Sequence, residues 1–266
     1  MQISLDGVRV LVTGGGAGIG WKTAEAFMAS GARVHICDLS KENLAAFSAA
    51  FPKAGATLTD VADHHAVDKL FDEIKARMGG LDVLVNNAGL SGPIGPVEDV
   101  DPAAWQSVYA ANIHGTFYCT RRAIPMMREA GGGSIINISS AAGHLPYGWR
   151  SPYSSSKWAV VGFTKTVAVE VGTDKIRVNA LMPGVVAGER RDRNARIRAE
   201  QAGKSAEEME AVRLGRVAME KAVEPEEIAD LAVFLASDHA RSITGQTIGV
   251  DGYVLALTGP ENRPPR

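Results

Sequence analysis

The sequence predicts an α/β fold: a single Rossmann-type, doubly wound domain over residues 1–266, with a seven-stranded parallel sheet and helices on both faces. Short, β-rich apolar runs alternate with longer segments of helical periodicity, which is typical of this architecture. The apolar runs, such as VRVLV at 8–12 and LDVLV at 81–85, are continuous, as expected for strands covered by helices on both faces. The first run leads directly into a glycine-rich turn and a helix.

Each element is predicted from its pattern, in chain order. Short apolar runs predict the strands Val8–Val12, Arg33–Cys37, Thr57–Thr59, Leu81–Val85, Ser134–Ile138, Arg177–Leu181 and Thr247–Val250. Helical periodicity predicts the helices Ile19–Ala29, Lys41–Ala49, His64–Met78, Pro102–Ala130, Pro152–Val171 and Pro225–Ala236. A densely charged segment at about 184–219 has no strand pattern and is predicted as a helical insertion after the sixth strand. Ligands of such sheets bind at the carboxyl ends of the strands, so we expect this insertion to cover the substrate.

Composition and net charge indicate which kinds of binding partner to expect. Apolar residues make up 45% and charged residues 22% of the chain, the balance of a globular protein. A net charge of -2 gives no reason to expect nucleic acid or an anionic membrane, and no apolar run is long enough to span a bilayer. The amino terminus has no leader pattern, so we expect a cytoplasmic protein acting on a small molecule.

No metal site is expected. Cys37 and Cys119 have no partner at metal-ligand spacing and are predicted to be buried thiols. The histidines show no H-E-x-x-H or similar spacing and are treated as ordinary polar or packed residues.

The glycine-rich turn is the first candidate ligand site. The segment TGGGAGIG at 13–20 lies between the first strand and the first helix. Glycines allow a tight turn and close approach of a pyrophosphate, whose charge then lies at the amide-rich end of the helix. The spacing is G-x-x-x-G-x-G instead of G-x-G-x-x-G, and the alternative is a plain structural turn. The predicted dinucleotide contacts in this loop are Gly14, Gly16, Ala17, Gly18 and Ile19.

Asp38, at the end of the second strand, favours NAD over NADP. A carboxylate there can accept hydrogen bonds from ribose hydroxyls and repels a 2′-phosphate. Ala17 adds no positive charge to the loop, whereas Lys22 is a nearby cation. The structural alternative is that Asp38 only begins a turn in which Ser40 caps the next helix.

Further motifs are similar to those of the short-chain dehydrogenase/reductase family, from about Gly7 to Asp251. These are the glycine-rich loop, NNAG at 86–89, the pair Asp60 and Val61, and YSSSK at 153–157. Ser140 precedes Tyr153 by the thirteen residues typical of the family's active-site serine, and Asn112 resembles its catalytic asparagine.

The resemblance implies hydride transfer between a nicotinamide cofactor and an alcohol or carbonyl substrate, and a homotetramer. The implied catalytic residues are Asn112, Ser140, Tyr153 and Lys157. Besides Asp38 and the loop, the implied cofactor contacts are Asp60, Val61, Asn87, Ala88, Gly89, Tyr153, Lys157, Pro183, Gly184 and Val186. The sequence departs from the family pattern at Gly188, where members often have a threonine.

The chemistry of the Tyr153 and Lys157 pair can also be argued from spacing. Residues four apart share one face of a helix, and a neighbouring ammonium favours phenolate over phenol. Tyr153 would then exchange the alcohol proton while Ser140 holds the substrate oxygen. Ser139 is the competing serine, although strand alternation and spacing favour Ser140. In the family the asparagine supports a water chain to the lysine, so Asn112 takes that role by position.

Other readings stay open. One is an NADPH-linked 3-oxoacyl thioester reductase, and another is a dinucleotide-binding sensor without catalysis. A serine hydrolase is disfavoured because no G-x-S-x-G elbow follows a strand. The substrate is not readable, but two segments are expected near it. One is the loop at 141–152 with His144, Leu145, Tyr147, Trp149 and Arg150, which either selects the substrate or packs the rim. The other contains Arg190, Arg191, Arg193, Arg196 and Arg198, which either draw in an anionic substrate or form a solvated face.

Overall fold

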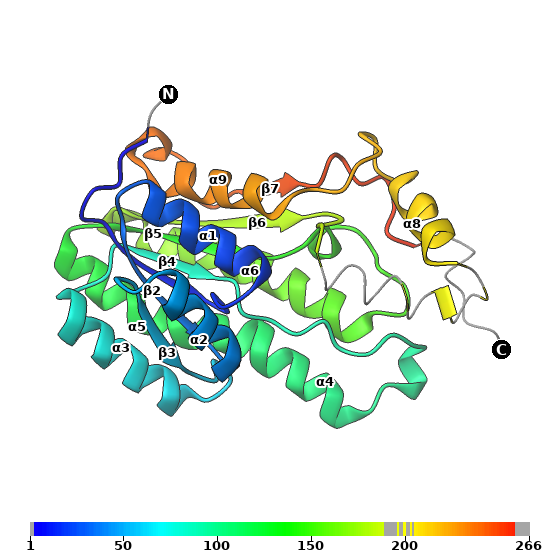
Figure 1. Ribbon diagram of the computed structural model, residues 1–266, viewed down its shortest axis with the longest axis horizontal. Helices are drawn as coiled ribbons and strands as arrows, with labels where there is room; N and C mark the ends of the chain where they lie inside the picture. Colours follow the sequence, from blue (N-terminus) through cyan, green and yellow to red (C-terminus); the bar gives the residue numbers. More distant parts are fainter. Residues whose placement is uncertain (1–2, 189–195, 197–198, 201–202, 204, 259–266) are drawn as a thin grey trace.

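A seven-stranded parallel sheet forms the centre of the molecule (Figure 1). The computed structural model describes residues 3–188, 196, 199–200, 203 and 205–258. The sheet order is β3-β2-β1-β4-β5-β6-β7, so the strand order reverses between β1 and β4. The strands are β1 Arg9–Thr13, β2 Arg33–Asp38, β3 Gly55–Leu58, β4 Val83–Asn86, β5 Gly133–Ile138, β6 Ile176–Pro183 and β7 Thr247–Val250. The predicted doubly wound α/β fold is confirmed.

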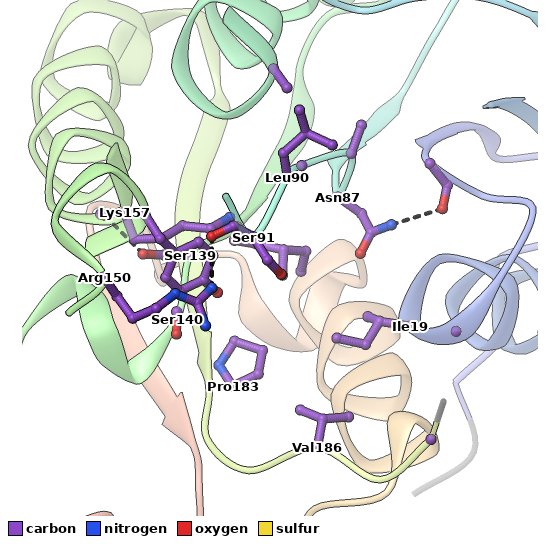
Figure 2. Close-up of a pocket in the computed structure, with 18 of the residues that line it drawn as sticks. Ile19, Asn87, Leu90, Ser91, Ser139, Ser140, Arg150, Lys157, Pro183 and Val186 are labelled. Carbon is purple, nitrogen blue, oxygen red and sulfur yellow. Dashed lines mark hydrogen bonds between the residues drawn. The ribbon is translucent and has the colours of Figure 1, made fainter. Parts of the chain in front are cut away.

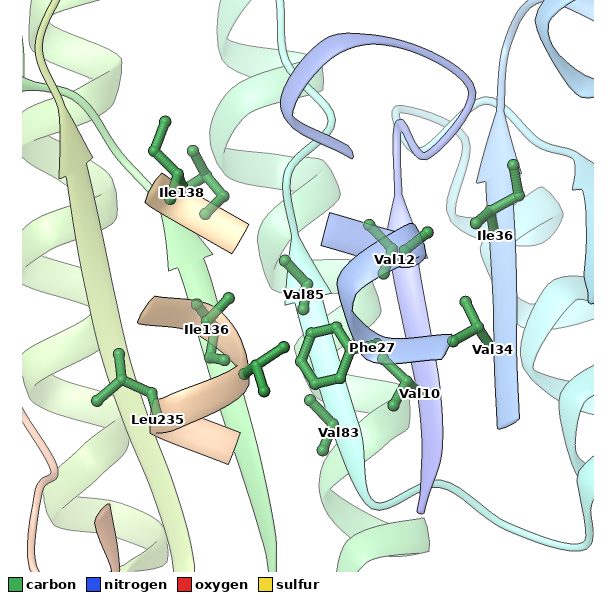
Figure 3. Close-up of a cluster of buried hydrophobic side chains, with 14 of the residues drawn as sticks. Val10, Val12, Phe27, Val34, Ile36, Val83, Val85, Ile136, Ile138 and Leu235 are labelled. Carbon is green, nitrogen blue, oxygen red and sulfur yellow. The ribbon is translucent and has the colours of Figure 1, made fainter. Parts of the chain in front are cut away.

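Helices cover both faces of the sheet. They are α1 Gly18–Ala29, α2 Lys41–Ala50, α3 His64–Met78, α4 Pro102–Tyr109, α5 Gly115–Ala130, α6 Ser151–Val171, α8 Ala206–Leu214 and α9 Pro225–Ala236. One buried cluster joins α1, α2 and α9 to the sheet, and a second joins α3, α5 and α6 to its other face. Successive strand residues point to opposite faces. Thus Val10 and Val12 belong to the first cluster, in which Phe27 is central, and Leu11 belongs to the second (Figure 3).

The third strand begins two residues earlier than the sequence predicts. The expected strand was Thr57–Thr59, whereas β3 begins at Gly55, which pairs with His35 of β2. A Cβ at Gly55 would lie 2.2 Å from the His35 ring, so a residue of low strand propensity is required there by packing. The other six predicted strands agree with the structure to within about two residues at each end.

The predicted single helix Pro102–Ala130 contains an irregularity that the sequence did not indicate. A π-helical turn, Ala110–His114, separates α4 from α5. Such turns are rare in proteins, but those that occur are often found at functional sites. This one carries Asn112, which is 1% exposed.

Part of the predicted insertion after β6 is helical: within its described residues, Ala206–Leu214 form α8. Ser205 and Glu208 form a capping box at the start of α8, which explains why a charged segment is helical there. Val186 and Val223 form a parallel bridge, and Val217 bridges Val254 in the antiparallel sense. The insertion is thereby tied to the segment that follows β7. No helix in the described ranges is both long and apolar enough to cross a membrane.

His35 is a buried, neutral side chain between β2 and α3. Its Nε2 lies 2.8 Å from Thr57 Oγ1, and Thr57 donates a hydrogen bond of 2.9 Å to Glu73. Since that hydroxyl proton goes to the carboxylate, the Thr57 oxygen accepts from His35. Burial lowers the pKa of His35 from 6.5 to about 4.

This burial makes stability depend on pH. Between pH 6.5 and 4 the unfolded chain binds a proton at His35 that the folded chain does not. The free energy of unfolding therefore falls as the pH falls through this window, by about 3 kcal/mol from this group. We expect His35→Gln, which keeps a donor near Thr57, to reduce this pH dependence in urea unfolding measured from pH 7 to pH 4.5. His144→Gln, at an exposed position, is the control. Parallel pH profiles for wild type and His35→Gln would contradict the assignment.

Candidate active site

The turn after β1 is shaped to receive an anionic group. Gly14 and Gly18 have φ values of +60° and +53°, the left-handed region that glycine adopts readily. A Cβ at Gly20 would lie 2.1 Å from the Gly14 carbonyl oxygen, so the first turn of α1 must contain glycine there. Ala17 caps α1 with no side-chain hydrogen bond, which leaves the first amides of the helix directed at the cavity. These features fit a pyrophosphate.

The segment that directly follows β4 holds this turn in place. The Asn87 amide donates to the carbonyl oxygens of Thr13 and Gly14, at 3.0 and 2.9 Å. In return, Thr13 Oγ1 accepts from the backbone amides of Asn87 and Ala88 at 3.0 and 3.1 Å. The NNAG segment therefore braces the glycine loop as well as lining the cavity.

Asp38 has a structural and a ligand-facing role together. Its carboxylate accepts from the amides of Gly16 and Ser40, at 3.0 and 2.9 Å, and it also lines the cavity. Ser40 caps α2, as the structural alternative required. Lys22, the nearby cation, is 2.9 Å from Glu25 and 3.1 Å from Glu226, and it is not part of the cavity wall.

A cavity of about 1710 Å³ opens at the carboxyl ends of the strands. It exceeds the volume usual for one small ligand and has room for a dinucleotide and a substrate. Every predicted site residue lines it except Gly16 and Asn112. The lining residues among those predicted are Gly14, Ala17, Gly18, Ile19, Asp38, Asp60, Val61, Asn87, Ala88, Gly89, Ser140, Tyr153, Lys157, Pro183, Gly184 and Val186.

Ser140, Tyr153 and Lys157 all line this cavity, and Figure 2 shows Ser140 and Lys157 among its lining residues. Lys157 is 6% exposed, and its ammonium donates to the Ile138 carbonyl oxygen at 2.7 Å. The same ammonium lies 5.8 Å from the centre of the Tyr153 ring. Ser140 is the second residue after β5 and is half-buried. The arrangement places the Tyr153 ring near a cation and a serine hydroxyl in the same cavity.

The two adjacent serines have different surroundings. Ser139 is 3% exposed and donates to the Lys157 carbonyl oxygen at 2.9 Å, so its hydroxyl proton is used within the protein. Ser140 Oγ accepts from the Ala142 amide at 3.1 Å, which leaves its proton available to a ligand. Both line the cavity, but this difference favours Ser140 as the ligand-binding serine.

Asn112 lies behind the cavity wall. Its side chain accepts from the Leu90 amide at 2.7 Å and donates to the Leu90 carbonyl and to Ser156 Oγ, at 3.0 and 2.9 Å. The π-helical turn thus connects the loop after β4 to α6. Its catalytic role, implied by the family resemblance, stays a prediction.

The loop that follows β6 forms part of the cavity wall. The Gly184 amide donates to the Val250 carbonyl at 3.1 Å, and a Cβ at Gly184 would lie 2.7 Å from Asp251. Gly188, where the family often has threonine, has a φ of +119° and also lines the cavity.

Sequence reasoning predicted that the insertion at about 184–219 covers the ligand, but it named none of the three lining residues Arg213, Arg216 and Val217 and missed the segment after β7. Val217, Val254 and Leu257 provide an apolar wall there, and Arg213 and Arg216 provide charge. The apolar run VLAL at 254–257, directly after the last strand, was the available signal. Burial lowers the pKa of Arg216. Tyr147 and Arg150 of the loop at 141–152 do line the cavity, whereas His144 is exposed and does not.

The structure places one arginine of the predicted Arg-rich segment and both cysteines. Arg190, Arg191, Arg193 and Arg198 lie outside the described residues, while Arg196 lines the cavity. Cys37 and Cys119 are fully buried, as predicted, and burial raises the pKa of Cys37 to about 12.

One surface cluster was not indicated by sequence spacing. His64, His65 and Asp68 lie close enough together to share a metal ion. Asp68 is, however, also paired with Arg121 and Arg122 at 2.7 and 3.1 Å. Two cations on the carboxylate disfavour a third.

Known proteins similar to this chain are oxidoreductases. A family described as Enoyl-(Acyl carrier protein) reductase matches residues 14–253. Meso-2,3-butanediol dehydrogenase of Serratia marcescens is 34% identical over 257 residues, covering 96% of this chain and 97% of that protein.

Solved structures give the same relationship. NAD+-bound xylitol dehydrogenase superposes with a TM-score of 0.89 at 28% identity, covering 93% of this chain and 98% of the other. A 3-ketoacyl-(acyl-carrier-protein) reductase from Brucella melitensis complexed with NADH gives 0.85 at 30% identity, covering 94% and 98%. The chain is an oxidoreductase that belongs to the short-chain dehydrogenase/reductase family.

Proposed function

We propose that the protein transfers hydride between NAD and a secondary alcohol or its ketone, with Tyr153 as the general acid and base. One observation carries this proposal: Ser140, Tyr153 and Lys157 line the same cavity into which the glycine loop of α1 opens. The glycine loop would hold the pyrophosphate of the dinucleotide at the carboxyl edge of the sheet, in the same cavity as the phenol. When bound, NAD supplies the ring that accepts or returns the hydride.

The side chains divide the proton chemistry among them. Tyr153 Oη removes the proton of the alcohol in oxidation and returns it to the carbonyl oxygen in reduction. Ser140 Oγ donates a hydrogen bond to the substrate oxygen and so fixes its distance from the phenol. The Lys157 ammonium favours the phenolate form by its charge and is placed to bond the cofactor ribose. Asn112 acts through Leu90 and Ser156 to position the wall and α6.

In this proposal, the glycine-rich loop and Asp38 select NAD over NADP. Asp38 faces the cavity at its adenosine end, and the neighbouring wall residues Leu39, Asn43 and Thr59 carry no positive charge. Asp60 adds a second carboxylate to that wall. A 2′-phosphate would meet negative charge with no cation in these neighbours to balance it.

The homotetramer and cytoplasmic location expected from the sequence belong to this proposal. The single-domain assignment, with the insertion at about 184–219 covering the substrate, belongs to it as well. Phe117 on α5 and Trp158 on α6, with exposed fractions of 45% and 50%, support contacts between subunits on that side.

Replacement of Tyr153 by Phe tests the catalytic assignment. Because only the hydroxyl is removed, we expect turnover of alcohols with NAD to fall about 10²- to 10⁴-fold. Binding of NADH, followed by its fluorescence, should change by less than about threefold. A screen of secondary alcohols, ketones and a 3-oxoacyl thioester, read by nicotinamide absorbance, supplies the substrates. Retained turnover in Tyr153→Phe would remove the phenol from the mechanism. Tight NADH binding without turnover of any compound by the wild type would favour the sensor.

Replacement of Asp38 by Asn tests the choice of cofactor. The amide oxygen can still accept from Gly16, so the loop is kept while the negative charge is lost. We expect the ratio of kcat/KM with NADP to that with NAD to rise about tenfold or more, which is about 1.4 kcal/mol. Asp63→Asn, at an exposed helix cap outside the cavity wall, is the charge-matched control. An unchanged ratio in Asp38→Asn would refute the assignment of Asp38.

A further inference from the structure

Arg150 is a buried cation on the substrate side of the cavity wall. It is 2% exposed and directly precedes α6. Its guanidinium carbon lies 5.0 Å from the centre of the Tyr153 ring and 5.5 Å from that of Tyr147. One Nη donates to the Ser91 carbonyl oxygen at 2.6 Å. Figure 2 shows the side chain extending into the cavity toward Ser140.

The backbone that presents Arg150 is unusual. Trp149 has a φ of +64°, a conformation that a bulky side chain rarely adopts. The Trp149 carbonyl accepts from Gly95 at 3.0 Å, which holds this conformation in place. Backbone outliers of this kind cluster at ligand sites, because the surrounding structure must stabilise them. Here the outlier directs Arg150 inward at the start of α6.

Arg150 has no counter-ion among the described residues. Its Nε is buried without a hydrogen-bond partner, and no described carboxylate forms an ion pair with it. By contrast, Arg213 of the same wall is 3.2 Å from Glu210. A buried charge is costly unless it is paired and hydrogen-bonded. A planar guanidinium with an unfilled donor is suited to an oxyanion.

The charge of the wall divides between its two ends. Asp38 and Asp60 lie at the adenosine end. The rest of the wall carries one carboxylate, Glu200, and an excess of cations: Arg150, Lys157, Arg196, Arg213 and Arg216. A cavity lined by one sign of charge concentrates ligands of the opposite sign. The end beside Tyr153 therefore favours an anion, even though the net charge of the chain is -2.

We propose that the alcohol or ketone substrate carries an oxyanion, a carboxylate a few carbon atoms from the reacting carbon, and that Arg150 binds it. This inference rests on the proposed function, since it names the substrate class of the same site. The short distance from Arg150 to the Tyr153 ring places the anion near the carbon that is oxidised. The competing role is that Arg150 only braces the two tyrosine rings by cation–π contact.

The test compares matched acids and amides. Oxidation with NAD is measured for hydroxy acids that carry the hydroxyl two, three or four carbons along the chain. Each acid is compared with its neutral primary amide. Sulfonate and phosphate analogues of the same lengths form separate arms. For wild type we expect kcat/KM for the acid to exceed that for its amide at least about tenfold at one length, chiefly through KM. Arg150→Met should bring this ratio to within about twofold of one, and Arg150→Lys should keep part of it.

Arg241→Met is the control for net charge, because Arg241 is exposed and lies outside the cavity wall. Its acid-to-amide ratio should equal that of the wild type. A preference for the sulfonate or phosphate analogue that is lost in Arg150→Met supports an oxyanion site at Arg150. In that case the anionic group of the substrate is a sulfonate or phosphate instead of a carboxylate. Equal losses for acid and amide in Arg150→Met, with the ratio kept, would show bracing only and overturn the proposal. Turnover of amides without preference for any acid overturns this proposal alone. Turnover of no alcohol overturns the proposed function and this proposal with it.

Discussion

The site depends on the way in which α6 is fastened to the end of β5. The Lys157 ammonium donates to the Ile138 carbonyl, and Ser139 donates back to the Lys157 carbonyl, so strand end and helix are joined in both directions. Ser154 adds a third bond to the Ala142 carbonyl at 3.0 Å. Because Tyr153 lies one helical turn before Lys157, these bonds set the position of the phenol over the cavity. A lysine used in this way is both a structural anchor and a source of charge.

Polar residues serve the fold and the ligand together elsewhere in the site. Asp38 fixes the glycine loop through Gly16 while facing the adenosine end, and Asn87 holds the same loop from the segment after β4. The buried Asn86 and Asn137 continue this pattern, with a hydrogen bond of 2.8 Å between β4 and β5. A substitution at such a position therefore changes ligand binding and folding at once. A test of one role needs a variant that preserves the other.

Local patterns in the sequence predicted the doubly wound α/β fold and the glycine-rich loop. They also predicted a site that Ser140, Tyr153 and Lys157 share. These features follow from periodicity, from turn chemistry and from motifs with fixed spacing. The start of β3 at Gly55 and the turn around Asn112 were not predictable in this way, since each is set by a tertiary contact with a distant residue. The absence of a counter-ion for Arg150 among the described residues has the same origin. The partners of Arg150 lie in the loop after β4 and on α6, and no local signal shows that a counter-ion is absent from them.

The most direct test of hydride transfer at this site follows one hydrogen atom. An alcohol that the protein oxidises is prepared with deuterium on the carbinol carbon, and the reduced dinucleotide is analysed by mass spectrometry. Our account predicts that the deuterium is recovered in the reduced nicotinamide ring, with none exchanged into water, because hydride passes directly between the two carbons. Unlabelled reduced cofactor, or deuterium released to the solvent, would contradict the account.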